Sequence, residues 1–358
     1  KQALAQLRQH PLISIIGIVG TALSIFLIML VVMMQQVKVA PFSPESNRNR
    51  FLHVHYMSIS HKDWGNGTSN GPMSVQTARE VYKSLKTPEA VTVYCCMTVS
   101  TPVSLPGAPA IGADVRETDD TFFHVFDFQF TDGKPYDEAT FTAGRPVAVI
   151  TESISRALFG SIQSVGKEFL LSHAPYRVVG VVKDVSTLAD MAYGQVWIPF
   201  TSTNLSNDTW SDNHMGMMSV TLLAHDREDF DEIRAEAKRR MNEYNSILAD
   251  QGYTLIDRNR PYDQETQSIS FAANLEPDLK AACRERVIIF IILLLVPAIN
   301  LSSMTQSRLR QRVAEIGVRR AFGSTRIEMV GQIVMENLVI TLLAGAIGLL
   351  ISILFAYW

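Results

Sequence analysis

Three segments of the chain contain residue types at spacings that could support chemistry. Residues 67–71, Gly-Thr-Ser-Asn-Gly, match the nucleophile elbow of esterases, in which the serine attacks the substrate. Residues 160–167 contain two glycines followed by a lysine, as phosphate-binding loops do. His53 and His55, with His61 nearby, could supply imidazole nitrogens to a zinc ion. Each chemistry also requires a particular arrangement of strands, turns and further ligands.

The surroundings of these segments argue against all three chemistries. Ser69 lies in a polar stretch, residues 61–72, which is predicted to be a loop, whereas an esterase serine lies between a strand and a helix. The second segment has five residues between its glycines instead of four, and Glu168 stands where a serine or threonine must bind magnesium. No cysteine or convergent carboxylate completes a zinc site, so the alternating histidines are interpreted as a solvated strand face. We therefore predict no catalytic residue, no cofactor and no metal in this chain.

The distribution of charge indicates the class of protein. The chain has 358 residues, of which 32 are basic and 35 acidic, and its formal net charge is −3. Residues 11–37, 287–307 and 337–358 contain no charged side chain, and each run reaches the ~20 residues of a membrane-spanning helix. The first run is longer than the ~7–15 apolar residues of a signal peptide, so we expect it to remain uncleaved. This composition excludes a soluble enzyme, a disordered chain and a nucleic-acid binder, and it predicts contact with membrane lipid.

Charge also predicts the topology. Lys1 and Arg8 precede the first apolar run, and six arginines and three glutamates lie between the second and the third. The long segment 38–286 carries the remaining 24 basic and 32 acidic residues. Short positively charged segments stay in the cytoplasm, whereas long domains are exported largely regardless of charge. We therefore predict a multi-pass inner-membrane protein with residues 38–286 in the periplasm. The chain lacks an initial methionine and stops with its third helix, so we expect it to be part of a longer protein.

The exported segment is predicted to be α+β. Apolar residues alternate with histidines over residues 52–56, which predicts a half-buried strand, and a helical pattern over 75–85 precedes a β-rich run over 90–99. The same order returns in predicted elements over residues 217–224, 226–247 and 253–256. The apolar face of this second helix is predicted to contain Phe230, Ile233, Ala237, Met241, Tyr244 and Ile247. Two β-α-β halves of this kind would form a split ferredoxin-like unit.

About a hundred residues separate the two halves, and they have a different pattern. Short predicted strands at 147–151, 176–182 and 195–198 are broken by glycine and proline, which indicates a β-rich subdomain. Several phenylalanines precede these strands: Phe122, Phe123, Phe126, Phe128 and Phe130. We predict that they pack in a core, the alternative being an exposed docking edge.

The apolar runs contain residues that affect helix packing. Pro297 removes a backbone hydrogen bond inside the second run and is expected to bend that helix. Asn300, with Ser302 and Ser303, is predicted to form hydrogen bonds between helices. Small residues predicted to permit close packing of the third helix are Ala344, Gly345 and Gly348. No charged residue interrupts the runs, so a proton-coupled carrier is not indicated.

The segment between the second and third runs has the most specific pattern. Charged and apolar residues interleave over 312–322, and Gly323 is predicted to end a short helix there. One interpretation is that the arginines only set the topology. The other is that this helix lies against a cytoplasmic protein, with Ile316, Val318 and Phe322 as apolar anchors and arginines around them.

Residues 315–324, Glu-Ile-Gly-Val-Arg-Arg-Ala-Phe-Gly-Ser, resemble the E-I-G-[IV]-R-[KR]-A-[LI]-G-A stretch of the MacB/FtsX/LolCE permease superfamily of ABC transporters. Further segments resemble the MacB-type periplasmic core, at residues 119–126, 147–152, 158–160, 165–167 and 176–184. Each match is short, but together they follow the order of the family over nearly the whole chain. Phe322 departs from the usual leucine, and the fourth helix of the family is expected in the longer protein.

The resemblance implies a permease that is not itself an enzyme. It would act as a dimer, with a second copy or a related permease, and with cytoplasmic ABC ATPase subunits that bind the ATP and magnesium. ATP hydrolysis would move the periplasmic domain, a mechanism called mechanotransmission. The implied ATPase-coupling residues are Arg312, Glu315, Ile316, Gly317, Val318, Arg319, Arg320, Phe322 and Gly323.

The resemblance also implies a division into domains. The implied parts are the N-terminus with the first helix (1–37), the periplasmic core (38–286) and the permease domain with the other helices (287–358). Within the core, the porter subdomain would comprise residues 50–100 and 215–258, and residues 104–212 would form a Sabre-like insertion.

Three functions fit this resemblance. The first is export of peptides, drugs or other periplasmic substrates, with a periplasmic adaptor and an outer-membrane channel as further partners. The others are an FtsX-like regulator of a cell-wall hydrolase and a lipoprotein-release permease. FtsX-like outside domains are smaller and lack the β-rich insertion, so the sequence favours the exporter.

Overall fold

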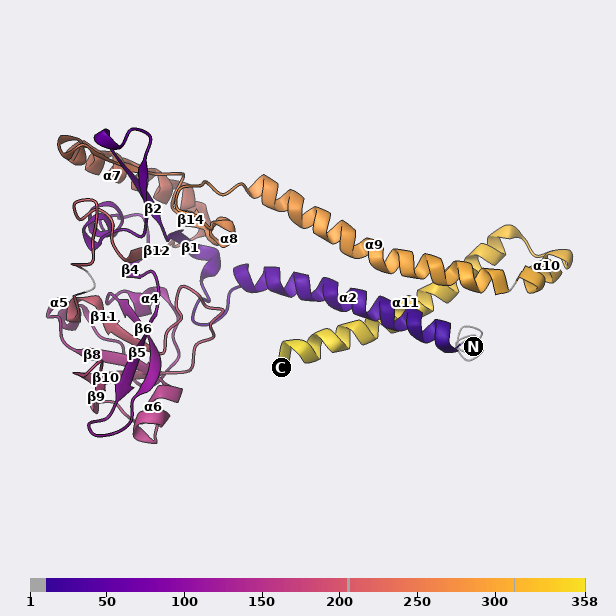
Figure 1. Ribbon diagram of the computed structural model, residues 1–358, viewed down its shortest axis with the longest axis horizontal. Coiled ribbons are helices and arrows are strands. Elements are labelled where there is room, and N and C mark those ends of the chain that lie inside the picture. Colours follow the sequence, from indigo (N-terminus) through magenta and orange to yellow (C-terminus); the bar gives the residue numbers. More distant parts are fainter. Residues whose placement is uncertain (1–10, 205–206, 312, 358) are drawn as a thin grey trace. The chain divides into compact units, whose positions relative to one another are not determined.

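The computed structural model describes residues 11–204, 207–311 and 313–357. The chain divides into two compact units. The helical unit comprises the residues up to Val37 and those from Asp278 onward, and the α+β unit comprises Lys38–Pro277. The strands shown in Figure 1 belong to the α+β unit.

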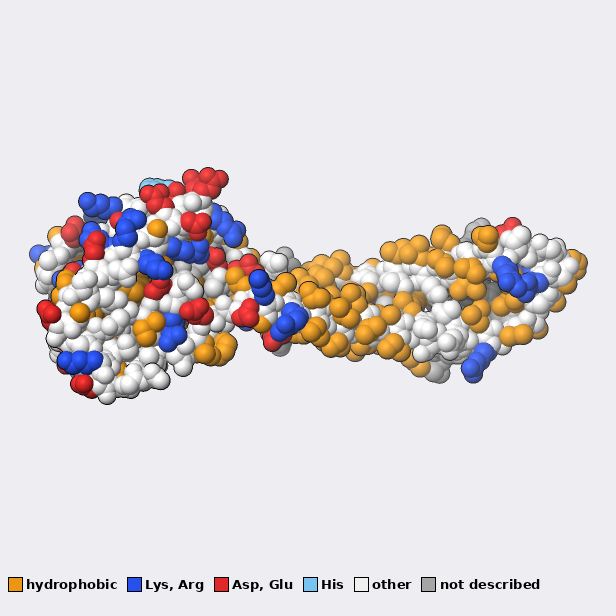
Figure 2. Space-filling view, turned by 90° about the horizontal axis from the view of Figure 1, so that it is seen from above, with side chains coloured by type: hydrophobic (Ala, Val, Ile, Leu, Met, Phe, Trp, Pro, Cys, Tyr) orange, Lys and Arg blue, Asp and Glu red, His pale blue; other side chains and the backbone are white. Residues whose placement is uncertain are grey.

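Long apolar helices form the helical unit. They are α2 (Pro11–Val39), α9 (Leu279–Gln311) and α11 (Arg326–Tyr357), with the short α10 (Val313–Ala321) between the last two. Among the described residues, three segments are long and apolar enough to cross a membrane: Ile15–Val39, Leu279–Ser307 and Arg326–Ala356. Hydrophobic side chains cover much of the visible surface of this unit in Figure 2. A helix that is apolar all round is typical of a membrane span, so these helices are suited to lipid.

Two β-α-β segments interleave in the α+β unit. The first contributes β1 (Phe51–Val54), β2 (Met57–His61), β3 (Thr68–Gly71), α3 (Val75–Thr77), η3 (Ala78–Lys83) and β4 (Ala90–Cys95). The second contributes β12 (Met218–Leu223), α7 (Phe230–Leu248), β13 (Tyr253–Ile256), β14 (Tyr262–Asp263) and α8 (Gln264–Ile269). Strand β12 lies between β4 and β1 and is antiparallel to both, and β13 pairs with β2.

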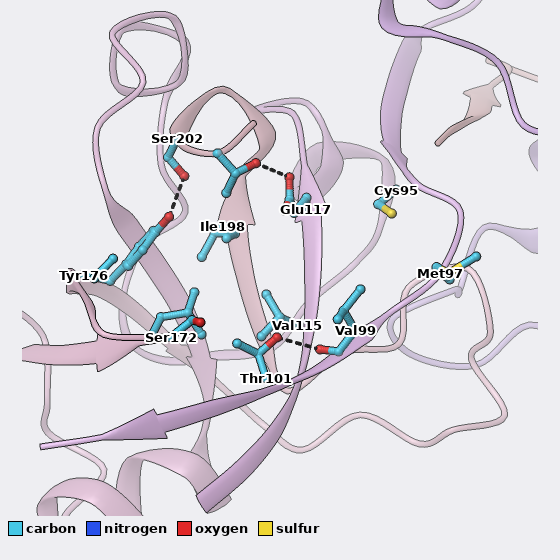
Figure 3. A pocket seen from close by; sticks show the side chains of 13 residues that line it. Cys95, Met97, Val99, Thr101, Val115, Glu117, Ser172, Tyr176, Ile198 and Ser202 are labelled. Carbon is cyan, nitrogen blue, oxygen red and sulfur yellow. Dashed lines mark hydrogen bonds between the residues drawn. The ribbon is translucent and has the colours of Figure 1, made fainter. Parts of the chain in front are cut away.

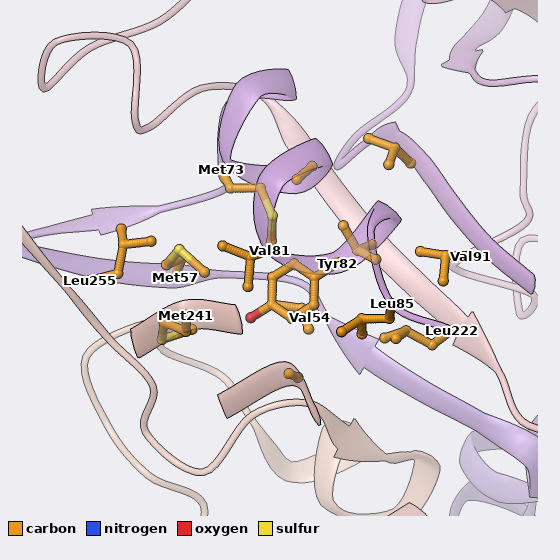
Figure 4. Close-up of a cluster of buried hydrophobic side chains, with 14 of the residues drawn as sticks. Val54, Met57, Met73, Val81, Tyr82, Leu85, Val91, Leu222, Met241 and Leu255 are labelled. Carbon is orange, nitrogen blue, oxygen red and sulfur yellow. The ribbon is translucent and has the colours of Figure 1, made fainter. Parts of the chain in front are cut away.

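Local capping explains where the two crossover helices begin. The Ser74 hydroxyl accepts a hydrogen bond from the Thr77 backbone N–H at 3.1 Å, which satisfies a donor at the start of α3. Asp226 and Asp229 form a capping box before α7. The helices then pack on the strands through a shared core, in which Val81, Tyr82 and Met241 are buried (Figure 4). Burying a side chain of this kind contributes about 1.5–3 kcal/mol relative to leaving it exposed.

The structure corrects three details predicted for these segments. The strand predicted over 52–56 ends after Val54 of β1, and His53 is only 1% exposed, so the solvated-face interpretation is wrong for this histidine. The predicted loop over 61–72 contains β3, which pairs antiparallel with β2. Ile247 is 63% exposed, and Leu248 takes the buried position at the end of the α7 face because it follows Tyr244 by four residues.

The strands between the two segments close into a ring. They are β5 (Val99–Ser104), β6 (Ile111–Thr118), β8 (Val147–Thr151), β9 (Glu168–Leu171), β10 (Ala174–Val182) and β11 (Val196–Pro199). They pair in the order β11-β8-β10-β9-β5-β6, and β6 pairs back to β11. Among the described residues, these strands therefore form a small closed barrel whose lumen is filled by side chains such as Val115, Phe169 and Val178. The barrel is joined to β4 through β6.

A second core lies where the barrel meets the interleaved segments. Phe122 and Phe126 are fully buried there, Phe128 is almost so, and Phe123 and Phe130 pack against them. The prediction that these phenylalanines pack in a core is confirmed. Of the remaining elements, α4 (Phe122–Val125) and β7 (Phe130–Gly133) contribute to this core, whereas α5 (Glu138–Thr142) packs against the first core and α6 (Glu152–Phe159) against the barrel core.

Candidate functional site: the short helix α10 and the ends of its neighbours

The end of α10 is fixed by backbone hydrogen bonds. Gly323 has φ +93°, a conformation that glycine adopts readily and other residues rarely do. Its N–H donates to the Arg320 carbonyl at 3.1 Å, and the Ser324 N–H donates to the Arg319 carbonyl, also at 3.1 Å. This pair of bonds is the Schellman arrangement, which terminates a helix after satisfying its last carbonyls. The sequence signal at Gly323 therefore corresponds to the observed end of α10.

The start of α11 is fixed in the same way. The Thr325 N–H donates to Glu328 Oε2 at 2.9 Å, and the Glu328 N–H donates to Thr325 Oγ1 at 3.3 Å. This reciprocal pair is a capping box. Only residues 322–325 separate the two helices, and both helix ends are capped, so the exit direction of α10 is well defined.

The predicted apolar anchors do not all lie on one face of α10. Val318 is 57% exposed and Phe322 is 88% exposed, and their spacing of four residues places them side by side. Ile316 is partly buried, and its position two residues before Val318 directs it to the other side of the helix. The exposed apolar surface therefore consists of Val318 and Phe322, which we call the α10 apolar face.

The polar and glycine positions of α10 differ in their surroundings. Arg319 Nη1 donates to Gln332 Oε1 at 2.8 Å, which ties α10 to α11, whereas Arg320 is exposed. A methyl group added at Gly317 would meet no described atom of the chain within 4 Å. Arg312 lies outside the described residues, and the Glu315 side chain is likewise not described.

The helices that support α10 make one especially close contact. A Cβ atom at Gly348 would lie 2.6 Å from the Ala22 carbonyl oxygen of α2, so α2 and α11 touch at this glycine. A Cβ atom at Gly345 would make an ordinary contact of 3.6 Å with Ile25, and Ala344 is fully buried. Of the predicted packing residues on α11, Gly348 is therefore the one with no room for a side chain.

A polar contact that the sequence did not single out joins α9 to α11. Asn337 Nδ2 donates to Thr305 Oγ1 at 2.9 Å. Hydrogen bonds of this kind contribute modestly to helix association in membranes. The Asn300 side chain is not described, and Pro297 lies within the continuous helix α9. The sequence feature that could have pointed to Asn337 is its position as a polar residue at the start of the third apolar run.

Where α2 leads into the α+β unit, buried polar residues hold the connecting chain. Arg48 donates to the carbonyls of Ala40 and Leu188 at 3.0 Å each, and its Nε donates to Glu45 Oε2 at 2.7 Å. The other Glu45 oxygen accepts from the backbone N–H groups of Met191 and Ala192. Burial raises the pKa of the Glu45 carboxyl, and the Arg48 charge opposes that shift.

A second polar contact joins the start of the α+β unit to its last helix, α8. Gln264 Nε2 donates to the Lys38 carbonyl at 2.8 Å, and Gln264 Oε1 lies 2.8 Å from His53 Nε2. His53 Nδ1 lies 3.1 Å from Thr221 Oγ1, so both ring nitrogens are engaged. Burial lowers the pKa of His53 to about 4. Strands β1 and β14 pair beside this contact, Leu52 with Asp263 and His53 with Tyr262.

Comparison with known proteins covers most of the chain. Residues 12–240 match the MacB-like periplasmic core domain family, and residues 287–358 match the FtsX-like permease C-terminal family. The uncharacterized ABC transporter permease YknZ of Bacillus subtilis is 22% identical over 244 residues, which are 66% of this chain and 55% of that protein. The macrolide export ATP-binding/permease protein MacB of Burkholderia cenocepacia is 24% identical over 68% of this chain and 33% of its own length.

Solved structures were compared as well. The periplasmic region of MacB from Actinobacillus actinomycetemcomitans matches 57% of this chain and 88% of its own, with 18% identity and a TM-score of 0.38. The chain spans about a third to about half of the length of the two curated relatives. With a family match over most of its residues, the chain belongs to the MacB/FtsX-type family of ABC transporter permeases and combines a MacB-like periplasmic core with an FtsX-like permease segment.

Proposed function

We propose that this chain is the non-catalytic permease subunit of a MacB-like ABC transporter. In this proposal, α10 docks on a separate cytoplasmic ATPase and passes the movement caused by ATP hydrolysis to the α+β unit in the periplasm. The observation that carries the proposal is the exposure of the α10 apolar face. The helix that presents this face is held in place, because the end of α10 and the start of α11 are both capped.

The chemistry of α10 suits a protein partner. Interface energy is concentrated in a few buried anchors, often aromatic, that are surrounded by polar residues. Phe322 is such an aromatic side chain, Val318 lies beside it, and Arg320 supplies a positive charge near them. Gly317 adds a position at which a partner backbone could approach closely, since the space beside it is open within this chain.

The proposal includes the remaining parts of the assembly. The ATPase would bind ATP and magnesium, and a second permease copy or a related permease would complete a dimer in the inner membrane. The interleaved segments would be the porter subdomain, and the barrel between them the Sabre-like subdomain. Substrates would be peptides, drugs or other periplasmic compounds, passed to an adaptor and an outer-membrane channel.

The proposed function can be tested with α10 variants that should no longer bind the ATPase. Val318→Asp combined with Phe322→Asp introduces charge into the α10 apolar face, and we expect association to weaken by about 1–4 kcal/mol for the lost anchors. The measurement is recovery of the ABC ATPase that copurifies with the wild-type permease from its native membranes.

Val313→Asp is the matched control. Val313 is 65% exposed on α10, similar to Val318, but points away from Val318 and Phe322. The control is expected to retain the ATPase. If the double variant inserts in the membrane and still binds the ATPase as the wild type does, α10 is not the coupling helix.

A further inference from the structure

A cavity opens at one end of the barrel in the α+β unit. Its volume is about 440 Å³, within the usual range of small-molecule sites, roughly 300–1,000 Å³. Apolar side chains form most of its wall: Met97, Val99, Val115, Leu171, Tyr176 and Ile198 (Figure 3). The mouths of β-barrels are common ligand sites because the strands hold the surrounding side chains rigidly. We call this cavity the barrel mouth.

One carboxylate faces the barrel mouth. Side chains alternate along a strand, so Glu117 of β6 lies on the same face as Ala113 and Val115, both of which are buried in the barrel core. Glu117 is therefore the next inward position after the core ends. Its Oε2 accepts a hydrogen bond from the Thr203 hydroxyl at 2.6 Å.

No cation accompanies this carboxylate in the part of the chain that the structure describes. None of the described lining residues is a lysine or an arginine, and no described basic side chain forms an ion pair with Glu117. Burial raises the pKa of the Glu117 carboxyl to about 7, with smaller contributions from Cys95 and Asp208. A carboxylate that loses water without gaining a positive partner is electrostatically unsatisfied.

Two other polar groups of the cavity lining have partners within the protein. The Tyr176 hydroxyl lies 3.1 Å from Ser202 Oγ, and Thr101 Oγ1 donates to the Val99 carbonyl at 3.1 Å. A ligand would therefore meet a mostly apolar wall and one carboxyl group, which carries a negative charge above about pH 7.

We propose that the barrel mouth binds an amphipathic cation, with its apolar body against the wall and its single positive nitrogen or phosphorus centre beside Glu117. The site is contained in the α+β unit and does not depend on what α10 contacts, so this proposal and the proposed coupling function can fail independently of each other. An apolar cavity with one acidic group selects by charge sign, because an anion of the same shape would be repelled.

The probes for this site are tetraphenylphosphonium and tetraphenylborate, ions of similar shape and opposite charge. Binding to the full chain in lipid nanodiscs would be measured by calorimetry at about pH 8, where the Glu117 carboxyl is mostly ionised. We expect saturable binding of the cation, and Glu117→Gln to weaken it about tenfold or more, because the variant removes the Coulombic attraction between the carboxylate and the bound positive charge. Glutamine retains an oxygen that can accept from Thr203, so the variant removes the charge with little change in shape.

Two further variants complete the test. Val99→Trp should block the cavity and abolish cation binding without altering Glu117, since Val99 is half-exposed in the wall. Glu80→Gln, an exposed carboxylate outside the cavity lining, should leave binding unchanged and so controls for net charge. The proposal is overturned if, after binding to empty nanodiscs is subtracted, the anion binds as tightly as the cation, if the cation does not saturate, or if Glu117→Gln binds it as the wild type does.

Discussion

His53 is the central residue of a hydrogen-bonded chain that crosses three strands of the α+β unit. Gln264 and Thr221 engage its two ring nitrogens, and Thr221 Oγ1 also lies 2.9 Å from the Tyr94 hydroxyl. Sequence alone identified the alternation around His53 but assigned it to a solvated face. Gln264, its partner, lies 211 residues away in the chain, so no local pattern could reveal that this histidine is buried and paired.

This burial predicts a pH dependence of stability. The pKa of His53 is about 4 in the folded chain and 6.5 when unperturbed, so the unfolded chain binds more protons between these values. The contribution of neutral His53 to the free energy of unfolding is complete above pH 6.5. It is lost as the pH falls toward 4, and the total loss is about 3 kcal/mol. Thermal unfolding of the detergent-solubilised chain can be followed by tryptophan fluorescence. The unfolding temperature of the wild type should fall more steeply toward acid pH than that of His53→Gln.

The control for this prediction is His173→Asn, because His173 is exposed and has φ +71°, which asparagine tolerates. It should keep the wild-type pH profile. Identical profiles for His53→Gln and the wild type would show that His53 does not titrate in this range.

Arg48 leads to a second prediction at the residue scale. Arg48→Met leaves the buried Glu45 carboxylate without its cation and the Ala40 and Leu188 carbonyls without a donor. Breaking a buried ion pair in this way costs about 3–5 kcal/mol of unfolding free energy. Arg177→Met removes the exposed pair with Glu168 and should cost about 0–1 kcal/mol. Equal unfolding midpoints for the two variants would contradict the role assigned to Arg48.

At the scale of elements, the close approach of α2 and α11 predicts the effect of one methyl group. Gly348→Ala places Cβ 2.6 Å from a backbone oxygen of α2, which cannot move alone, so the two helices must separate. Gly331→Ala on the same helix meets no described atom within 4 Å and should be neutral or stabilising by up to about 1 kcal/mol. The helical circular dichroism of the detergent-solubilised chain should therefore melt at a lower temperature in Gly348→Ala alone. A melt unchanged from wild type would mean that the contact is not tight.

Elements with strong local signals were the predictable part of the fold. Helical spacing located α7 and the helical turns of α3 and η3, and Gly323 located the end of α10. The closed barrel was not predictable, because β6 closes it by pairing with β11, about eighty residues later, and no local pattern encodes that pairing. On α10, Ile316 and Val318 are only two residues apart and point to opposite sides, so an anchoring role for both remains a prediction.

For the whole molecule, the predicted topology can be tested by labelling. In a chain whose native Cys95, Cys96 and Cys283 are replaced, a membrane-impermeant maleimide applied to intact cells with a permeabilised outer membrane should label Asn207→Cys. It should not label Ser324→Cys until the inner membrane is opened, because the Arg-rich segment is predicted to be cytoplasmic. Labelling of Ser324→Cys while the inner membrane is intact would show that the predicted orientation is wrong.

The hydrogen bond between Lys38 and Gln264 has a consequence for how such proteins can be recombined. Lys38 is the first residue of the α+β unit and Gln264 begins its last helix, α8, so this bond and the pairing of β1 with β14 hold the start of the unit beside its C-terminal part. The residues between Lys38 and Gln264 can therefore differ between relatives while this contact is kept. A chimera that exchanges the residues between these two points for those of a relative would keep the contact between Lys38 and Gln264 at its junctions, and a ligand preference of the barrel mouth is then expected to move with the exchanged residues.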